Sequence, residues 1–181
     1  ETAKILAETL KNNGFKIYSG GTDTHLMLVD LRPFNVKGNV AAESLCRANI
    51  TCNKNGIPFD TEKPMITSGI RLGSQAATTR GFGLKEFEKV GELITKVIKG
   101  LSENPEDNSK VENEVRNEVI NLCSNFPIYK NLNKWSALYV KRVRLQLSTH
   151  VQLKMVPLYV EEDYVFCLLY TSDAADERSC V

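Results

Sequence analysis

The sequence predicts an α+β domain in which a small antiparallel sheet packs against helices. Residues 84–101 and 111–123 each carry apolar side chains at three- and four-residue spacing, which is typical of amphipathic helices. Shorter apolar runs at 25–31 and 66–72 are bounded by Gly, Asn, Ser and Pro, which is typical of strands between turns. With 181 residues, 42% of them hydrophobic, the chain is long enough for one core with an appendage.

The N-terminal stretch predicts a helix followed by a hairpin. Residues 1–13 carry apolar side chains at helical spacing, and Asn-Asn-Gly at their end is a stop signal. Residues 15–18 predict a first strand, residues 19–23 a turn, and residues 25–31 a second strand with apolar side chains on both faces. The two strands are expected to pair antiparallel.

The next two segments predict a short helix and a ligand-presenting loop. Residues 40–49 have the Ala/Leu spacing of a helix. Its expected core-facing residues are Val40, Ala41, Leu45 and Cys46. Residues 50–60 are expected to be extended and then to turn, because their Asn-Gly and Ile-Pro steps resist a helix. Loops of this kind often present side chains to ligands.

Residues 66–82 combine a short buried strand, an arginine and a Thr-rich turn. Arg71 lies between Gly69 and Gly73, whose bare backbone permits a close approach. A guanidinium there offers a planar fork of donors that matches a carboxylate or a phosphate. The sequence therefore predicts a small anion at Arg71, with a protein carboxylate as the alternative partner. For Arg80, a structural ion pair is the expectation.

The two long helices close the predicted fold. Residues 84–101 and 111–123 are separated by a polar linker that contains Pro105. The charge-rich outer face of the second helix accounts for its Glu and Arg residues without a binding partner.

Composition argues against several classes of protein. The net charge of +1 results from 23 Lys+Arg against 22 Asp+Glu, which leaves no basic excess to attract nucleic acid or an anionic membrane. The five cysteines are widely spaced and lack a C-x-x-C pair, so neither a disulfide framework nor a zinc site is predicted. We expect reduced thiols in a cytoplasmic protein. The charged opening at Glu1 has no apolar signal core, and the chain is expected to begin inside a longer protein.

Three motifs resemble, in this order, the C-terminal part of the serine hydroxymethyltransferases. They are KIYSGGTDTHLMLVDL at 16–31, RANITCNKNGIPFD at 47–60 and KPMITSGIRLGSQAATTRGF at 63–82. The resemblance covers residues 1–130. It implies the small C-terminal domain of the fold-type I pyridoxal-phosphate fold, which is also called the aspartate aminotransferase fold.

The resemblance also implies which residues bind ligands. Arg71 matches the arginine that clamps the α-carboxylate of serine or glycine in this family. Asn55 matches the asparagine that hydrogen-bonds the folate pteridine ring, to which an amide can both donate and accept. Lys63, Pro64 and Met65 fall where many members place Ser-Pro-Phe against the folate. Met65 is a tolerable apolar substitute, whereas Lys63 cannot reproduce the hydroxyl hydrogen bond.

The family reaction implied is the exchange of a one-carbon unit between serine and tetrahydrofolate. It yields glycine and 5,10-methylenetetrahydrofolate, with pyridoxal 5'-phosphate as the electron sink and a homodimer or larger homo-oligomer as the assembly. No lysine of this sequence lies in the T-T-T-H-K-like context that anchors the cofactor, so we expect the fragment alone to be inactive and to contain no catalytic residue.

Two other interpretations remain open. One is a stand-alone small domain that acts as a binding or regulatory module. The other is a different fold-type I pyridoxal-phosphate enzyme, which would explain Arg71 but not the Asn55 region.

The C-terminal third has a different character. Residues 131–166 follow no settled period and resemble no part of the family, so they stay unassigned, with a genuine extension that binds a partner as the competing interpretation. The segment CLLYTSDAADE at 167–177 is similar to the in-frame translation of a transposase-type sequencing adapter. We therefore expect residues 167–181 to derive from an adapter.

Overall fold

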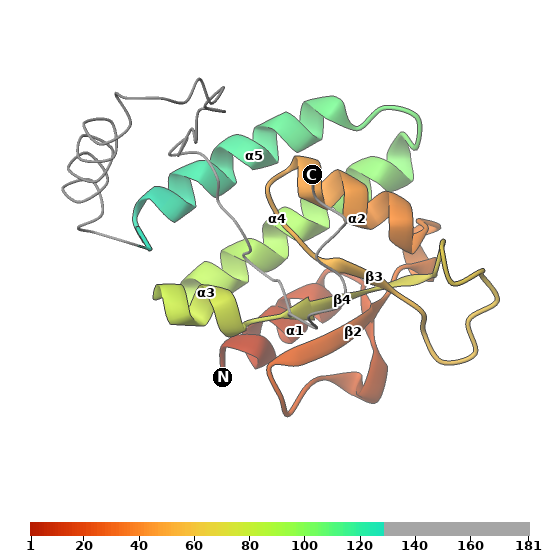
Figure 1. The fold of residues 1–181 in the computed structure, drawn as a ribbon, viewed down its shortest axis with the longest axis horizontal. Coiled ribbons are helices and arrows are strands. Elements are labelled where there is room, and N and C mark those ends of the chain that lie inside the picture. The colour runs from red at the N-terminus through yellow and green to blue at the C-terminus, as the bar shows by residue number, and fades with distance from the viewer. Residues whose placement is uncertain (129–181) are drawn as a thin grey trace, which may run out of the picture. The chain divides into compact units, whose positions relative to one another are not determined.

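The predicted α+β architecture is confirmed for residues 1–128, the part of the chain that the computed structural model describes (Figure 1). The helices are α1 (Thr2–Asn12), α2 (Gly38–Arg47), α3 (Gln75–Arg80), α4 (Leu84–Glu103) and α5 (Ser109–Ser124). The strands are β1 (Lys16–Ile17), β2 (Leu26–Asp30), β3 (Asn53–Asn55) and β4 (Gly69–Gly73). Short 3-10 helices occupy Tyr18–Gly20 and Arg32–Phe34. The assignments made for 131–166 and 167–181 lie outside the described residues.

The strands form one antiparallel sheet in the order β1-β2-β4-β3. One face buries Met27, Val29, Ile70 and Leu72. Helices α1 and α2 lie against the sheet, α4 packs across both of them, and α5 lies against α4 and α2 (Figure 1). Because side chains alternate along a strand, the residues between those four point to the opposite face, which no described helix covers.

Helix α4 forms where its apolar periodicity predicts it. All seven of the predicted apolar residues are buried: Phe87, Val90, Leu93, Ile94, Val97, Ile98 and Leu101. Its first turn is capped by Glu86, whose carboxylate accepts a hydrogen bond from the Gly83 N–H at 2.9 Å. The helix thus combines a local start signal with a continuous core-facing apolar stripe.

Helix α5 begins two residues before the predicted segment and ends one residue after it. Its buried face includes Glu112 beside Val115, Val119 and Cys123. The expectation that its acidic residues all belong to a solvated outer face was therefore wrong for Glu112.

The Thr-rich segment after β4 is helix α3 rather than a turn. It ends at Gly81, which adopts a left-handed conformation with φ of 110°. The ion pair expected for Arg80 is replaced by bonds to backbone carbonyls. Its Nε donates to Phe126 O at 2.6 Å and its Nη2 to Cys123 O at 3.1 Å, so Arg80 holds the C-terminal end of α5.

Helix α2 starts two residues earlier than predicted and presents a different face to the core. Its buried residues are Gly38, Ala41, Ser44 and Leu45. Val40 is 37% exposed and Cys46 is half-buried, so their predicted core positions were wrong. The cause is Ser44, which takes a core position because its hydroxyl donates to Glu112.

Candidate functional site

Arg71 lies in the middle of β4, flanked by a strand on each side. The register places it opposite Leu28 of β2 and Asn53 of β3. Paired residues share a face of the sheet, so all three side chains lie on the face away from the helices. Arg71 is half-buried there. Its backbone position is thus fixed by ladders on both sides while its side chain reaches the surface.

The predicted close approach at Gly69 is confirmed, and the group that approaches belongs to the protein. A Cβ added to Gly69 would lie 2.5 Å from Ile57 Cγ2 and 2.7 Å from Val29 O. Gly69 pairs with Asn55 of β3. The missing side chain therefore lets the segment after β3 fold tightly over β4.

A groove of about 890 Å³ runs between α2, β3 and the loop that follows it. It brings together three of the residues that the sequence predicted for folate: Asn55, Pro64 and Met65. Lys63 is exposed and does not belong to the lining of this groove, and neither does Arg71. Arg71 nevertheless lies next to the groove, because it pairs with Asn53 of β3, and Asn53 lines the groove.

Asn55 ends β3 with its side chain half-exposed. Its Nδ2 donates to Gly56 O at 2.8 Å. Asn53 and Asn55 are two residues apart on one strand, and their partners on β4 are Arg71 and Gly69. By strand alternation, Asn53, Asn55 and Arg71 lie on the same sheet face.

Met65 lies on a turn at the rim of the groove, with its side chain exposed. The Lys63 carbonyl accepts hydrogen bonds from Ile66 N at 2.9 Å and Thr67 N at 3.0 Å, which closes the turn. Pro64 is exposed, and Met65 is 73% exposed. The apolar, polarisable thioether of Met65 is therefore accessible to a ligand in the groove.

The loop that follows β3, residues 56–68 (the groove loop), is held to β4 by Asp60, a residue that the sequence pattern did not single out. Its carboxylate accepts hydrogen bonds from Ile57 N, Glu62 N and Ser68 N, at 2.9 to 3.2 Å, and from Ser68 Oγ at 2.7 Å. Burial opposes ionisation, but the Ser68 hydroxyl and these amides outweigh it and lower the pKa of Asp60 to about 2.

Acid is expected to loosen this loop. Because the folded pKa of Asp60 lies below its ordinary value of 3.8, the stabilisation is present above about pH 4 and is lost as the pH falls toward 2. Asp60→Asn should therefore lower the free energy of unfolding by about 1 kcal/mol at pH 7, with a smaller difference at pH 3. Urea unfolding at both pH values measures this. Asp23→Asn, at a fully exposed carboxylate, is the control, and a pH-independent loss in Asp60→Asn would contradict the prediction.

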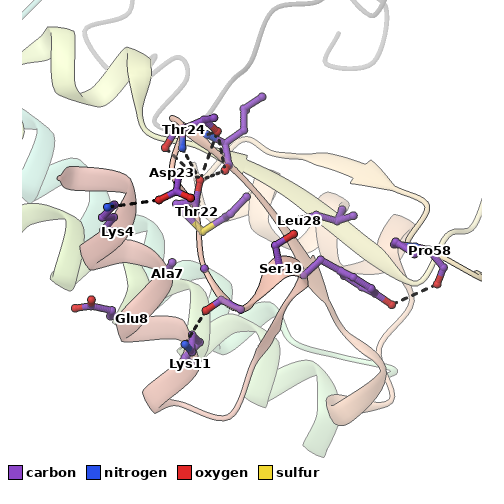
Figure 2. A pocket seen from close by; sticks show the side chains of 15 residues that line it. Lys4, Ala7, Glu8, Lys11, Ser19, Thr22, Asp23, Thr24, Leu28 and Pro58 are labelled. Atoms are coloured by element: carbon purple, nitrogen blue, oxygen red, sulfur yellow. Dashed lines mark hydrogen bonds and ion pairs between the residues drawn. The ribbon is translucent and has the colours of Figure 1, made fainter.

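A second pocket, of about 710 Å³, lies between α1 and the β1–β2 connection (Figure 2). None of the predicted site residues lines it. Lys11 Nζ donates to Gly20 O at 2.7 Å, and Lys4 Nζ lies 3.6 Å from Asp23 Oδ1 (Figure 2). Both of its lysines therefore contact groups of the pocket itself, and we assign it no ligand.

The described residues do not fit the anchoring of pyridoxal phosphate. A lysine that reacts as a neutral amine is normally desolvated. None of the lysines in residues 1–128 is buried.

Residues 1–128 contain no group of three or more His, Cys, Asp or Glu placed to hold a metal ion. No helix of the same segment is long and apolar enough to cross a membrane.

The comparisons with known proteins agree on one family. The model of the family "Serine hydroxymethyltransferase" matches residues 1–94, which is more than half of the chain. The relative from Pelagibacter ubique (strain HTCC1062), named serine hydroxymethyltransferase, is 91% identical over 130 residues, which are 72% of this chain and 30% of the relative. Relatives of the same name from Marinomonas sp. (strain MWYL1) and Paramagnetospirillum magneticum (strain ATCC 700264 / AMB-1) are 64% and 62% identical, over 71% and 72% of this chain.

The chain spans about 30% of the length of each of these curated relatives. The family match includes both structural features of the candidate site, the β4 arginine and the groove beside β3. The chain belongs to the serine hydroxymethyltransferase family.

Proposed function

We propose that this chain is the C-terminal part of a serine hydroxymethyltransferase, in which residues 1–130 form the small domain of the fold-type I pyridoxal-phosphate fold. The parent enzyme interconverts serine plus tetrahydrofolate with glycine plus 5,10-methylenetetrahydrofolate, as a cytoplasmic homodimer or larger homo-oligomer. The observation that carries the proposal is the position of Arg71 on the helix-free face of the sheet, one ladder away from a groove that contains Asn55.

Arg71 is the proposed clamp for the substrate α-carboxylate. Two parallel hydrogen bonds from a guanidinium fix both the position and the plane of a carboxylate, which a single ammonium cannot do. Strands β2 and β3 hold the backbone of Arg71 on both sides, so the fork starts from a rigid base. We expect most of its contribution to the reaction to come from orienting the amino acid.

The groove beside β3 is the proposed folate site. Its lining includes Asn53 and Asn55 together with the exposed residues Pro64 and Met65. Amides can donate to and accept from the edge of a planar heterocycle, while apolar surface covers its faces. Lys63 is proposed at the periphery of this site, because it lies outside the groove lining.

The cofactor is proposed to be held by parts of the parent enzyme beyond residues 1–128. When bound, pyridoxal phosphate supplies the electron sink for the reaction. The residues of this chain bind and orient the serine carboxylate and the folate. The chain alone is therefore expected to be inactive.

A chimeric enzyme tests the proposal. Residues 1–128 of this chain would replace the corresponding region of the 91%-identical relative. We expect the chimera to form glycine from serine only when tetrahydrofolate is present, and the chain alone to form none. A soluble chimera that loads the cofactor but lacks this activity would refute the proposal and favour the binding-module interpretation.

Asn55→Ala in the chimera tests the folate site. Loss of the amide is expected to raise the KM for tetrahydrofolate about tenfold, equivalent to about 1.4 kcal/mol, with the KM for serine unchanged. Steady-state kinetics with each substrate varied in turn measures both constants. Asn121→Ala, at an exposed position of α5, is the matched control. Equal changes in both KM values would argue for a general distortion instead of a lost folate contact.

A further inference from the structure

We propose that Glu112 of α5 is a positioning residue for the groove and acts on it through Arg47 and helix α2. The identity of the ligand, tetrahydrofolate, rests on the proposed function above. The mechanical link between Glu112 and the groove wall rests on the contacts of the described residues alone.

Glu112 is a buried carboxylate bonded by two residues of α2. Its side chain is 7% exposed. Arg47 Nε donates to Oε2 and Arg47 Nη2 donates to Oε1, both at 2.7 Å, in a bidentate pair. Ser44 Oγ donates to Oε1 at 2.6 Å. These charge-assisted bonds from Arg47, with the Ser44 hydroxyl, outweigh burial and lower the pKa of Glu112.

Asn108 extends the contact from α2 to a third helix. Its Nδ2 donates to Ser44 Oγ at 3.2 Å and to Val97 O of α4 at 3.1 Å. The network therefore connects α2, α4 and α5 through directional bonds. A shift of α2 along or around its axis would lengthen several of these bonds together.

Arg47 connects this network to the groove. Its side chain is 57% exposed, and it lines the groove together with Glu43 from the same helix. Glu112 itself does not line the groove. The buried carboxylate can therefore affect a ligand only by holding α2 and the guanidinium of Arg47 in place.

The other end of α2 is bonded to the groove loop. Gly38 N donates to Thr67 O at 3.0 Å, and Asn39 N donates to Ile66 O at 2.9 Å, directly after the turn that carries Met65. Helix α2 is thus attached to α5 at one end and to the rim of the groove at the other. Movement of the helix would displace the wall and the rim together.

Apolar packing alone would hold α2 against the core without fixing its register. Ala41 and Leu45 are fully buried, but apolar contacts are non-directional. The two parallel bonds from Arg47 to Glu112 are directional, and the buried Glu112 carboxylate would lose its compensating charge if α2 moved away. The structure therefore assigns Glu112 to the alignment of α2.

Glu112→Gln in the chimeric enzyme is the first test. Glutamine has almost the same shape but lacks the charge, so we expect the KM for tetrahydrofolate to rise about fivefold, with the KM for serine and kcat unchanged within about twofold. Glu118→Gln is the matched control, because Glu118 lies on the same helix but bonds Lys89 and Lys96 of α4, at 2.9 and 3.1 Å. The control should leave both KM values unchanged. Equal rises in both KM values would overturn the proposal, and so would unchanged KM values in a chimera whose KM for tetrahydrofolate does respond to Asn55→Ala.

Amide hydrogen exchange on the 181-residue chain gives a readout that needs no ligand. In Glu112→Gln, the N–H groups of Gly38 and Asn39 should exchange about tenfold faster, while that of Ile94, in the core of α4, stays the same. Uniform acceleration at all three would indicate a loss of global stability only and would overturn the proposal. Ser44→Ala removes a single bond to Glu112, so it provides a milder variant with the same expected direction if Glu112→Gln does not fold.

The two proposals can fail separately. If Asn55→Ala leaves the KM for tetrahydrofolate unchanged while Glu112→Gln accelerates exchange at Gly38, the folate site is wrong and the alignment of α2 by Glu112 stands. If Asn55→Ala acts on folate and Glu112→Gln changes neither the exchange nor the KM, the positioning proposal is wrong and the folate site stands.

Discussion

Arg71→Lys in the chimeric enzyme is expected to raise the KM for serine about thirtyfold, equivalent to about 2 kcal/mol. Lysine keeps the positive charge but replaces a planar fork with a single point of attachment. The carboxylate would then lose one of two parallel bonds and its fixed plane. Because the neighbouring strands hold the backbone of Arg71 on both sides, no shift of β4 can restore the second bond.

Arg32→Lys is the matched control for this experiment. Arg32 follows β2 and already forms a fork with Asp30, with Nε–Oδ1 at 2.9 Å and Nη2–Oδ2 at 2.6 Å. Its loss should affect stability and leave the KM for serine within about twofold. An unchanged KM for serine in Arg71→Lys would contradict the proposal that Arg71 binds the substrate carboxylate. Equilibrium binding of glycine to both variants would separate a binding defect from a kinetic one.

The elements that the sequence predicted well are those whose pattern is local. Helix α4 needs only the spacing of its apolar residues and a cap, and both lie within one segment. The strand around Arg71 is likewise defined by Ile70 and Leu72, which are buried on one face. Neither prediction required knowledge of a distant partner.

The predictions that were wrong depended on a partner far away in the chain. Ser44 was not among the residues expected in the core, and Glu112 was expected on a solvated face. They are 68 residues apart and meet in the core, where the Ser44 hydroxyl donates a hydrogen bond to the Glu112 carboxylate. Apolar spacing cannot detect a buried polar pair, so the face of α2 was misplaced and Val40 was expected inside.

The sequence proposed the residues of the candidate site one by one but not their arrangement. Resemblance singled out Asn55, Pro64, Met65 and Arg71, yet nothing in the sequence stated that β3 would pair with β4. That pairing places Asn55 opposite Gly69, two residues before Arg71. The register of a sheet is set by tertiary contacts, so the groove and its distance from the arginine required the structure.

Gly38→Ala is expected to lower the free energy of unfolding by about 3 kcal/mol or more, because no space exists for the added methyl group. A Cβ at Gly38 would overlap Thr67 Oγ1 and lie 2.5 Å from Gly69 O. Gly69 O is backbone in the central ladder, so it can move only if β4 moves. Denaturant unfolding of the 181-residue chain measures the effect.

Gly21→Ala is the control for this variant, since a Cβ there would meet nothing within 4 Å and Gly21 has extended backbone, with φ of 168°. Its free energy of unfolding should change by less than about 0.5 kcal/mol.

Helix α2 cannot retreat from the clash at Gly38, because Gly38 N is bonded to Thr67 O and Glu112 holds the other end of the helix. Thr67 cannot yield easily either, since it is buried and, with φ of 61°, already occupies a left-handed conformation that is costly for a β-branched residue. A near-neutral Gly38→Ala would mean that α2 slides, and the rigid groove wall proposed for Glu112 would then be excluded as well.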